Sequence, residues 1–202
     1  MTKAQTKSLG VGKLAKKRAS EATRLDSQAW VHAALDILAA QGVDGLRVEI
    51  LAKQLGVTKG SFYWHFRDRD ALLEAILDAW RRQATLRIIS RLDQTTPSSE
   101  GRLRQLLSLP FQGPRSERGA DVELSLRLWS RRDPRARAAL AEVDQLRLSY
   151  IAGLLEDCGC SSDDAKARAV LAYSFIRVGT TLIGGKDNAT LEICLSLLAK
   201  SA

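Results

Sequence analysis

The residues from Lys59 to His65 concentrate polar and aromatic side chains that suit contact with nucleic acid. A lysine can donate to guanine or phosphate oxygens, and Gly60 allows close approach of the backbone. Hydroxyl and imidazole groups can donate to phosphate, while the indole of Trp64 offers apolar contact to sugars or a thymine methyl. The segment therefore predicts a face that enters a DNA major groove, consisting of Lys59, Gly60, Ser61, Tyr63, Trp64 and His65.

Two short helices are expected to position this face. Apolar residues recur at helical spacing from Val48 to Leu55, Gly56 ends that helix, and Thr58 is placed to cap a second helix that runs to Phe66. Phe62 lies four residues before Phe66, so both rings can face inward and leave the polar side chains outside. Two short helices joined by a tight turn have the dimensions of a helix-turn-helix.

The rest of the chain after residue 25 has helical periodicity, with no competing strand alternation. Asp68 is placed to cap a long helix that runs to about residue 91. Thr96-Pro97 and Asp133-Pro134 each place a cap before a proline in the first helical position. Residues 111–119 are expected to form a loop. The predicted fold is all-α with about nine helices: a basic mobile arm at 1–25, a helix-turn-helix DNA-binding domain at 26–80, and a helical ligand-binding and dimerisation domain at 81–202.

The charge balance indicates a polyanionic partner. The 202 residues contain 31 Lys or Arg and 23 Asp or Glu, a formal net charge of +8. The arm at 1–25 holds seven basic residues and one acidic residue. It is expected either to follow the DNA backbone or enter a minor groove, or to be a solvated tail that raises non-specific affinity.

Composition also limits the cellular setting. Hydrophobic residues make up 45% and charged residues 27%, as in folded soluble proteins. No apolar run approaches the roughly 18–20 residues that span a bilayer, and the N-terminus lacks the apolar stretch of a secretory signal. The three cysteines are too few for a disulfide framework. A cytoplasmic protein without a membrane partner is expected.

The last two helices predict self-association. Apolar or small residues occupy nearly every side of the segment from Val170 to Ile183, and the segment from Leu191 to Leu198 is similar. A helix that is apolar all round must be buried all round. A homodimer formed through about residues 162–200 satisfies this need; two central helices of a monomer are the alternative.

No constellation for catalysis or metal binding is present in the sequence. His32 and His65 are isolated from each other and from clustered carboxylates. Cys158-Gly159-Cys160 falls at a helix end, where Gly serves as a C-cap, and Gly184-Gly185-Lys186-Asp187 lacks the strand and the Ser or Thr of a phosphate-binding loop. We expect no enzyme, no cofactor and no metal.

Polar groups embedded in apolar helices mark a possible ligand site. Arg177 lies among apolar residues, and Arg127 lies two residues from Trp129. A buried Arg requires an anionic or hydrogen-bonding partner. That partner is either a ligand carboxylate or, for Arg127, the carboxylate of Glu123 four residues earlier. The candidate ligand-binding residues are Arg127, Trp129, Tyr150, Tyr173 and Arg177.

Residues 26 to about 77 resemble the DNA-binding domain of the tetracycline-repressor (TetR) family of bacterial regulators. The most specific part is the run Thr-Lys-Gly-x-x-Tyr-x-His-Phe from Thr58 to Phe66. It is accompanied by Ala33-Ala34, Gly42, Leu51-Ala52, Leu55-Gly56-Val57 and Leu72-Leu73.

The resemblance implies roles for individual residues. Thr58 to His65 would form the recognition helix, with Tyr63 and His65 on phosphates and Lys59 on a base or phosphate. Arg69 occupies a place where the family often has a phosphate-binding Lys. Arg47 replaces the usual Ser or Thr, so it can reach phosphate but does not cap its helix. The C-terminal half would hold an effector pocket, and its last two helices would form the dimer interface.

The expected function is sequence-specific DNA binding by a homodimer on a palindromic double-stranded operator. Repression, relieved by a small-molecule effector, is the mode we expect. Half-sites would lie about 34–36 Å apart. One alternative is a non-specific architectural DNA-binding protein that uses its basic arm. Another is a helical enzyme or ligand-binding domain whose N-terminal unit contacts only proteins.

Overall fold

The computed structural model describes residues 26–183 and 188–199, so the basic arm and the segment Gly184–Asp187 lie outside it. The described residues form an all-α fold without strands, as predicted. The described residues contain ten α-helical segments. Because the π-helical turn η2 joins α5 and α6 into one continuous helix, we count nine helices. The elements are α2 (Ser27–Gln41), η1 (Val43–Gly45), α3 (Val48–Gln54), α4 (Lys59–Phe62), α5 (Arg69–Arg81), η2 (Arg82–Leu86), α6 (Arg87–Thr95), α7 (Ser99–Ser108), η3 (Leu109–Phe111), α8 (Pro114–Ser130), α9 (Pro134–Asp157), α10 (Ser162–Ile183) and α11 (Asn188–Ala199).

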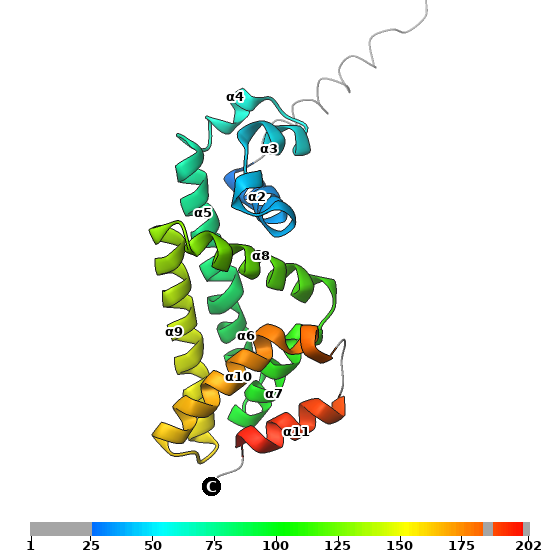
Figure 1. The fold of residues 1–202 in the computed structure, drawn as a ribbon, viewed down its shortest axis with the longest axis vertical. Helices are drawn as coiled ribbons and strands as arrows, with labels where there is room; N and C mark the ends of the chain where they lie inside the picture. The colour runs from blue at the N-terminus through cyan, green and yellow to red at the C-terminus, as the bar shows by residue number, and fades with distance from the viewer. Residues whose placement is uncertain (1–25, 184–187, 200–202) are drawn as a thin grey trace, which may run out of the picture.

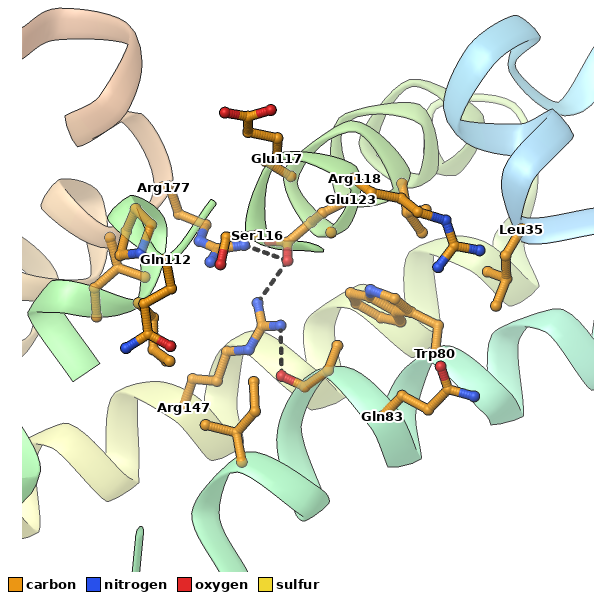
Figure 2. A pocket seen from close by; sticks show the side chains of 18 of the residues that line it. Leu35, Trp80, Gln83, Gln112, Ser116, Glu117, Arg118, Glu123, Arg147 and Arg177 are labelled. Carbon is orange, nitrogen blue, oxygen red and sulfur yellow. Dashed lines mark hydrogen bonds and ion pairs between the residues drawn. The ribbon is translucent and has the colours of Figure 1, made fainter. Parts of the chain in front are cut away.

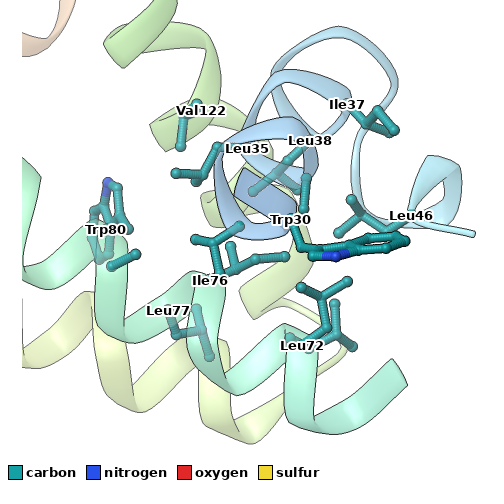
Figure 3. Close-up of a cluster of buried hydrophobic side chains, with 14 of the residues drawn as sticks. Trp30, Leu35, Ile37, Leu38, Leu46, Leu72, Ile76, Leu77, Trp80 and Val122 are labelled. Atoms are coloured by element: carbon teal, nitrogen blue, oxygen red, sulfur yellow. The ribbon is translucent and has the colours of Figure 1, made fainter. Parts of the chain in front are cut away.

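The helices divide the molecule into two ends that the long helix α5–η2–α6 connects (Figure 1). At one end, α2, α3 and α4 pack on α5, and α8 and α9 complete their hydrophobic core. Figure 3 shows this core, to which Trp30 of α2, Leu72 of α5 and Val122 of α8 contribute. A second core joins α6, α7, α9, α10 and α11. The first core crosses the predicted boundary at residues 80 and 81, and the domain division stays a prediction.

Several predicted helix starts are confirmed by their caps. The Asp26 carboxylate accepts a hydrogen bond from the Ala29 amide at 2.9 Å. The Asp68 carboxylate does the same for Ala71 at 2.9 Å. Asp133 accepts from the Arg135 amide at 2.8 Å, and Pro134 opens α9. These caps place the helices in the register that the sequence predicts.

Four predicted boundaries differ from the structure. Ser98, not Thr96, caps α7, and its hydroxyl accepts from the Gly101 amide at 3.1 Å. The predicted loop at 111–119 is helical from Pro114, because proline at the first position favours a helix start as it does at Pro134. The helix predicted over Thr58 to Phe66 is regular only over Lys59–Phe62, and turns complete it. The long helix reaches Thr95, beyond the predicted end near residue 91.

Candidate nucleic-acid interface and ligand cavity

The turn between α3 and α4 depends on a glycine. Gly56 has a φ of 68°, in the left-handed region that side chains other than glycine rarely adopt. The Val57 amide then donates to the Ala52 carbonyl at 2.9 Å, which closes the turn. No side-chain bond caps α3 at Arg47, as the replacement of Ser or Thr predicts. The Arg47 side chain is exposed.

An aromatic cluster fixes which side of α4 faces outward. The Phe62 ring lies edge-on to Trp30 at 5.4 Å and stacks on Phe66 at 5.4 Å. Both Phe side chains are buried, as predicted from their spacing. Tyr63 is 55% exposed and Trp64 88% exposed. Lys59, Gly60 and His65 are also exposed, and Ser61 is partly exposed. The predicted face is thus on the surface, and its contacts with DNA stay a prediction.

The Lys59 ammonium is already paired within the chain. It donates to the Glu49 carboxylate at 2.5 Å, across the turn from α4 to α3. The hydrogen bond to Glu49 raises the pKa of Lys59, and the same bond lowers the pKa of Glu49. Sequence reasoning missed this acid next to the predicted DNA face. A phosphate or base that binds Lys59 must compete with it.

Arg69 holds two elements together instead of projecting freely. Its guanidinium donates to the Leu46 carbonyl at 2.7 Å and to the Val43 carbonyl at 2.9 Å. These bonds fasten η1 and the start of α3 to the first turn of α5. Any phosphate contact by Arg69 would add to this positioning role.

Gly60 is not required by the chain around it. An added Cβ would meet only the Thr58 hydroxyl oxygen, at 3.7 Å, and the backbone has no positive φ. The Thr58 hydroxyl itself makes no capping bond to α4. Space at Gly60 is therefore open toward the outside, where a DNA backbone would approach.

A cavity of about 650 Å³ lies between the long helix α5–η2–α6 and the helices α8, α9 and α10 (Figure 2). Leu35 of α2, Trp80 of α5 and Val122 of α8 line it. These three side chains also belong to the first core, at the end of the molecule that carries the helix-turn-helix. Arg147 of α9 and Arg177 of α10 close the other side. We refer to this space as the large cavity.

The candidate ligand residues are distributed unevenly around this space. Arg177 lines the large cavity. Tyr150, Tyr173 and Arg177 line an adjoining small cavity of about 50 Å³. Arg127 and Trp129 line neither, and the Trp129 indole N–H donates to Asp133 at 3.1 Å. Sequence reasoning missed Trp80, Gln83 and Arg91 of the long helix α5–η2–α6, Gln112 after η3, and Arg118 of α8.

Behind the cavity, Glu123 is the centre of a buried ionic cluster. Its carboxylate accepts from Arg127 at 2.9 Å, from Arg147 at 2.8 Å and, at very short range, from Arg177. Asp144 also accepts from Arg127, at 2.8 Å. The i, i+4 pairing of Glu123 with Arg127 is one of the two partners that the sequence predicts for this arginine. Three guanidiniums share two carboxylates, which leaves one positive charge in excess.

The cluster shifts the ionisation of its members. Burial alone would raise the pKa of Glu123, but attraction by Arg147 and Arg177 and hydrogen bonds from Arg147 and Arg127 lower it to about 2. Burial raises the pKa of Tyr173 to about 12. Glu123 is thus ionised and Tyr173 is a neutral donor at physiological pH. The Tyr173 hydroxyl donates to Asp144 at 2.7 Å.

Arg147 joins the ionic cluster to the long helix. It donates to the Ala84 carbonyl at 3.1 Å and to the Thr85 hydroxyl at 3.2 Å, both within η2. π-Helical turns leave carbonyls poorly satisfied and recur at functional positions in helices. The same guanidinium therefore contacts the cavity wall and the irregular turn of α5–η2–α6.

Neither metal nor membrane features emerge from the described residues. No three His, Cys, Asp or Glu side chains gather there as a metal site requires. None of the helices between residues 26 and 183 or in 188–199 has the length and apolarity needed to cross a membrane. Cys158, Cys160 and Cys194 are free thiols.

The helix-turn-helix with its exposed face defines a DNA-binding transcriptional regulator, and comparison with known proteins identifies its family. Residues 31–76 match the family model of bacterial regulatory proteins, tetR family. The class A tetracycline repressor from transposon 1721 of Escherichia coli is 30% identical over 164 residues, which cover 79% of this chain and 67% of the repressor. The regulator SrpR of Pseudomonas putida is 39% identical over 64 residues, 32% of this chain and 30% of SrpR. The chain belongs to the TetR family.

Solved structures share the fold over most of its length. A transcriptional regulator from Rhodococcus sp. Rha1 has a TM-score of 0.66 at 18% identity, covering 86% of this chain and 93% of that one. A regulator from Saccharomonospora viridis, solved in complex with choline, has a TM-score of 0.67 at 20% identity, covering 89% and 94%. At such identities the likeness shows the fold alone.

Proposed function

We propose that this regulator is a repressor that binds a palindromic operator as a homodimer and leaves it when a small molecule fills the large cavity. A relative named as a tetracycline repressor supports repression. Two regulators of the same fold, solved in complex with choline and with stearoyl-CoA, support binding of a small molecule. A bacterial operator lies in the cytoplasm, so the protein would act there.

The observation that carries this proposal is the continuity of α5–η2–α6. The helix starts at Arg69, directly after the recognition segment, and its middle supplies Trp80, Gln83 and Ile88 to the cavity wall. If the long helix has two conformations, a ligand that binds one of them more tightly shifts the position of α4. Ligand control requires such a difference in affinity between two states.

The proposed DNA contacts are those of the exposed face and its neighbours. Helix α4 would enter the major groove, and the flanking arginines would contact phosphates. The contacting residues are Arg47, Thr58, Lys59, Gly60, Ser61, Tyr63, Trp64, His65 and Arg69.

The proposed dimer uses the apolar outer faces of α10 and α11. Leu171, Val178 and Leu182 recur along one side of α10 and are exposed in the single chain. Ile193 and Leu197 are exposed four residues apart on α11. Exposed apolar stripes of this kind mark protein interfaces. A two-fold dimer would place the two α4 helices about one DNA turn apart.

Selection from a random duplex library at near-physiological salt tests the proposal. We expect a palindromic motif with the native protein and loss of that motif when Arg47, Lys59 and Tyr63 are all replaced by Ala. Affinity for all sequences that merely falls with salt would favour the architectural alternative. With the operator in hand, release by added small molecules is measured by fluorescence anisotropy.

A further inference from the structure

The wall of the large cavity carries more positive than negative charge (Figure 2). Its described lining includes Arg91, Arg118, Arg147 and Arg177 but only two carboxylates, those of Glu117 and Glu123. The ionic cluster behind the wall also has one positive charge in excess, because three arginines share Glu123 and Asp144. Unbalanced charge away from water is unfavourable, so an anion would be stabilised here.

Two buried donors of the side chains that form this wall have no acceptor among the described residues. The indole N–H of Trp80 and the Nε–H of Arg177 are buried without a hydrogen-bond partner. Trp80 is 4% exposed, and the Arg147 guanidinium lies over its ring at 5.7 Å. A buried donor without an acceptor costs free energy. Both groups can only donate, but neither atom is accessible from the cavity as it stands, so a ligand oxygen would reach them only if the surrounding side chains moved.

Apart from Gln83, Gln112 and Ser116, the remaining side chains of the wall are mostly apolar and limit what else the ligand contains. The apolar side chains include those of Leu35, Ile88, Leu109, Pro110, Val122 and Ile176. The volume of about 650 Å³ is within the range of pockets that bind small organic molecules. The ligand therefore combines an anionic end with a hydrocarbon body.

We propose that the effector is a monocarboxylic acid with an apolar body, whose carboxylate binds beside Trp80, Arg147 and Arg177. The proposal rests on the proposed release by a ligand and specifies its chemistry. Because Arg118 is paired with Asp36, the wall keeps one excess positive charge, which a single negative charge balances and a dianionic phosphate would overcompensate. Guanidinium groups bind planar carboxylates well through two parallel hydrogen bonds.

This chemistry also provides a route to the DNA-binding end. The Arg147 donors that hold Ala84 and Thr85 in η2 are within the same guanidinium that faces the cavity. A ligand carboxylate competes for these donors with the carbonyl of Ala84 and the hydroxyl of Thr85. When Arg147 turns toward the ligand, η2 loses its clamp, and the path of α5 toward α4 changes.

Calorimetric titration of the full-length protein with matched acids and amides tests the proposal. Octanoate and benzoate are compared with the neutral octanamide and benzamide. We expect the better-fitting acid to bind at least tenfold more tightly than its amide. Arg177→Gln should remove that preference, whereas Arg132→Gln, which breaks a surface pair with Asp44, should leave it unchanged. Equal binding of acid and amide, or no binding of any of the four, would overturn the proposal.

Glu123→Gln separates ligand binding from a purely structural cluster. Without its carboxylate, the guanidiniums of Arg147 and Arg177 are free for the ligand, so acid affinity should rise several-fold. Unchanged or lower affinity in a folded variant would contradict the proposal; if the variant does not fold, the Arg177→Gln comparison decides. Operator binding is measured in parallel. If the protein binds an operator but none of the acids, only the proposed class of ligand is refuted. If it binds an acid but no operator sequence is found, only the proposed function is refuted.

Discussion

At the residue scale, Gly60 is a position where the chain itself imposes no constraint. Ala favours helix by about 1 kcal/mol over Gly, and a Cβ at Gly60 has room. We therefore expect Gly60→Ala to keep or raise the melting temperature while weakening operator binding at least tenfold, because the methyl group meets DNA. Thermal unfolding and operator titration measure the two effects. Gly153→Ala on α9, also with open space around its Cβ, should leave operator affinity unchanged. Unchanged operator affinity in Gly60→Ala would argue against close backbone approach.

The ion pair between Lys59 and Glu49 predicts that removal of the Glu49 charge increases the affinity for the operator. Glu49→Gln frees the Lys59 ammonium and removes a carboxylate beside the phosphates, so operator affinity should rise a few-fold at low salt. Titration at several salt concentrations measures this rise. Glu156→Gln, an exposed position at the far end of α9, makes the same change in net charge and should have little effect. Equal gains in both variants would indicate a general charge effect only.

Glu123 predicts a pH dependence of stability. Its pKa in the folded protein, about 2, is below the usual 4.5. A lowered folded pKa stabilises the protein above the unfolded pKa, and that contribution is lost as pH falls through 4.5 toward 2. The full shift corresponds to about 3 kcal/mol. In urea unfolding, the excess stability of the native protein over Glu123→Gln should be largest above about pH 5 and shrink as the carboxylate protonates. A constant difference between the two proteins would contradict this.

At the element scale, the sequence predicts the features that depend on residues close in the chain, such as helix caps and inward faces. It misses the features that depend on contacts between residues far apart in the chain. The inward faces of Phe62 and Phe66 follow from their spacing, and the Asp26, Asp68 and Asp133 caps follow from residues within one turn. The π-helical turn η2 does not follow in this way. Its partner Arg147 is 63 positions from Ala84, and only the packing of α9 on the long helix brings them together.

The same reason explains why the sequence predicts only part of the cavity lining. Arg177 and Tyr173 stand out because they are polar residues in an apolar helix. Trp80 and Arg118 have ordinary surroundings in the sequence, and only the fold places them on one wall. Trp129 is close to Arg127 along the chain, but it packs in the first core.

Thr85 tests whether η2 depends on the contact with Arg147. Thr85 is buried, and its hydroxyl accepts from the Arg147 Nε–H. Thr85→Val keeps the shape and removes the acceptor, so we expect a loss of about 1–2 kcal/mol in the free energy of unfolding. Chemical denaturation measures it. Thr95→Val is the control, because the exposed Thr95 hydroxyl bonds to near neighbours in the sequence, the Arg91 carbonyl and the Thr96 hydroxyl. Equal losses in both variants would show that the contact with Arg147 adds nothing.

At the scale of the whole molecule, ion pairs join the DNA-binding end to the helices that hold the ligand cavity. Arg118 of α8 pairs with Asp36 of α2 at 2.5 Å, and Arg135 of α9 pairs with Asp70 of α5 at 3.3 Å. Arg81 of α5 pairs with Glu142 of α9 at 3.0 Å. Exposed pairs contribute little each. The shared hydrophobic core of α2, α5, α8 and α9 therefore dominates the coupling between the two ends.

Self-association is the property of the whole molecule on which palindromic recognition depends. Leu171 and Leu182 of α10 are 65% and 77% exposed, which is costly unless a second copy covers them. Replacing both with Asp puts charges into the proposed interface, so light scattering at micromolar concentration should change from dimer to monomer mass. Leu124→Asp on α8, where Leu124 is 59% exposed, should remain dimeric.

The operator provides a second measurement of the same interface. A monomer presents one α4 helix, so it loses the added binding energy of the second half-site while each helix-turn-helix stays intact. We expect the double variant of α10 to bind a full palindrome no more tightly than a single half-site, whereas Leu124→Asp keeps the preference for the palindrome. If the double variant remained dimeric, the dimer interface would lie elsewhere than on α10. If the native protein were already monomeric, the proposed homodimer would be wrong.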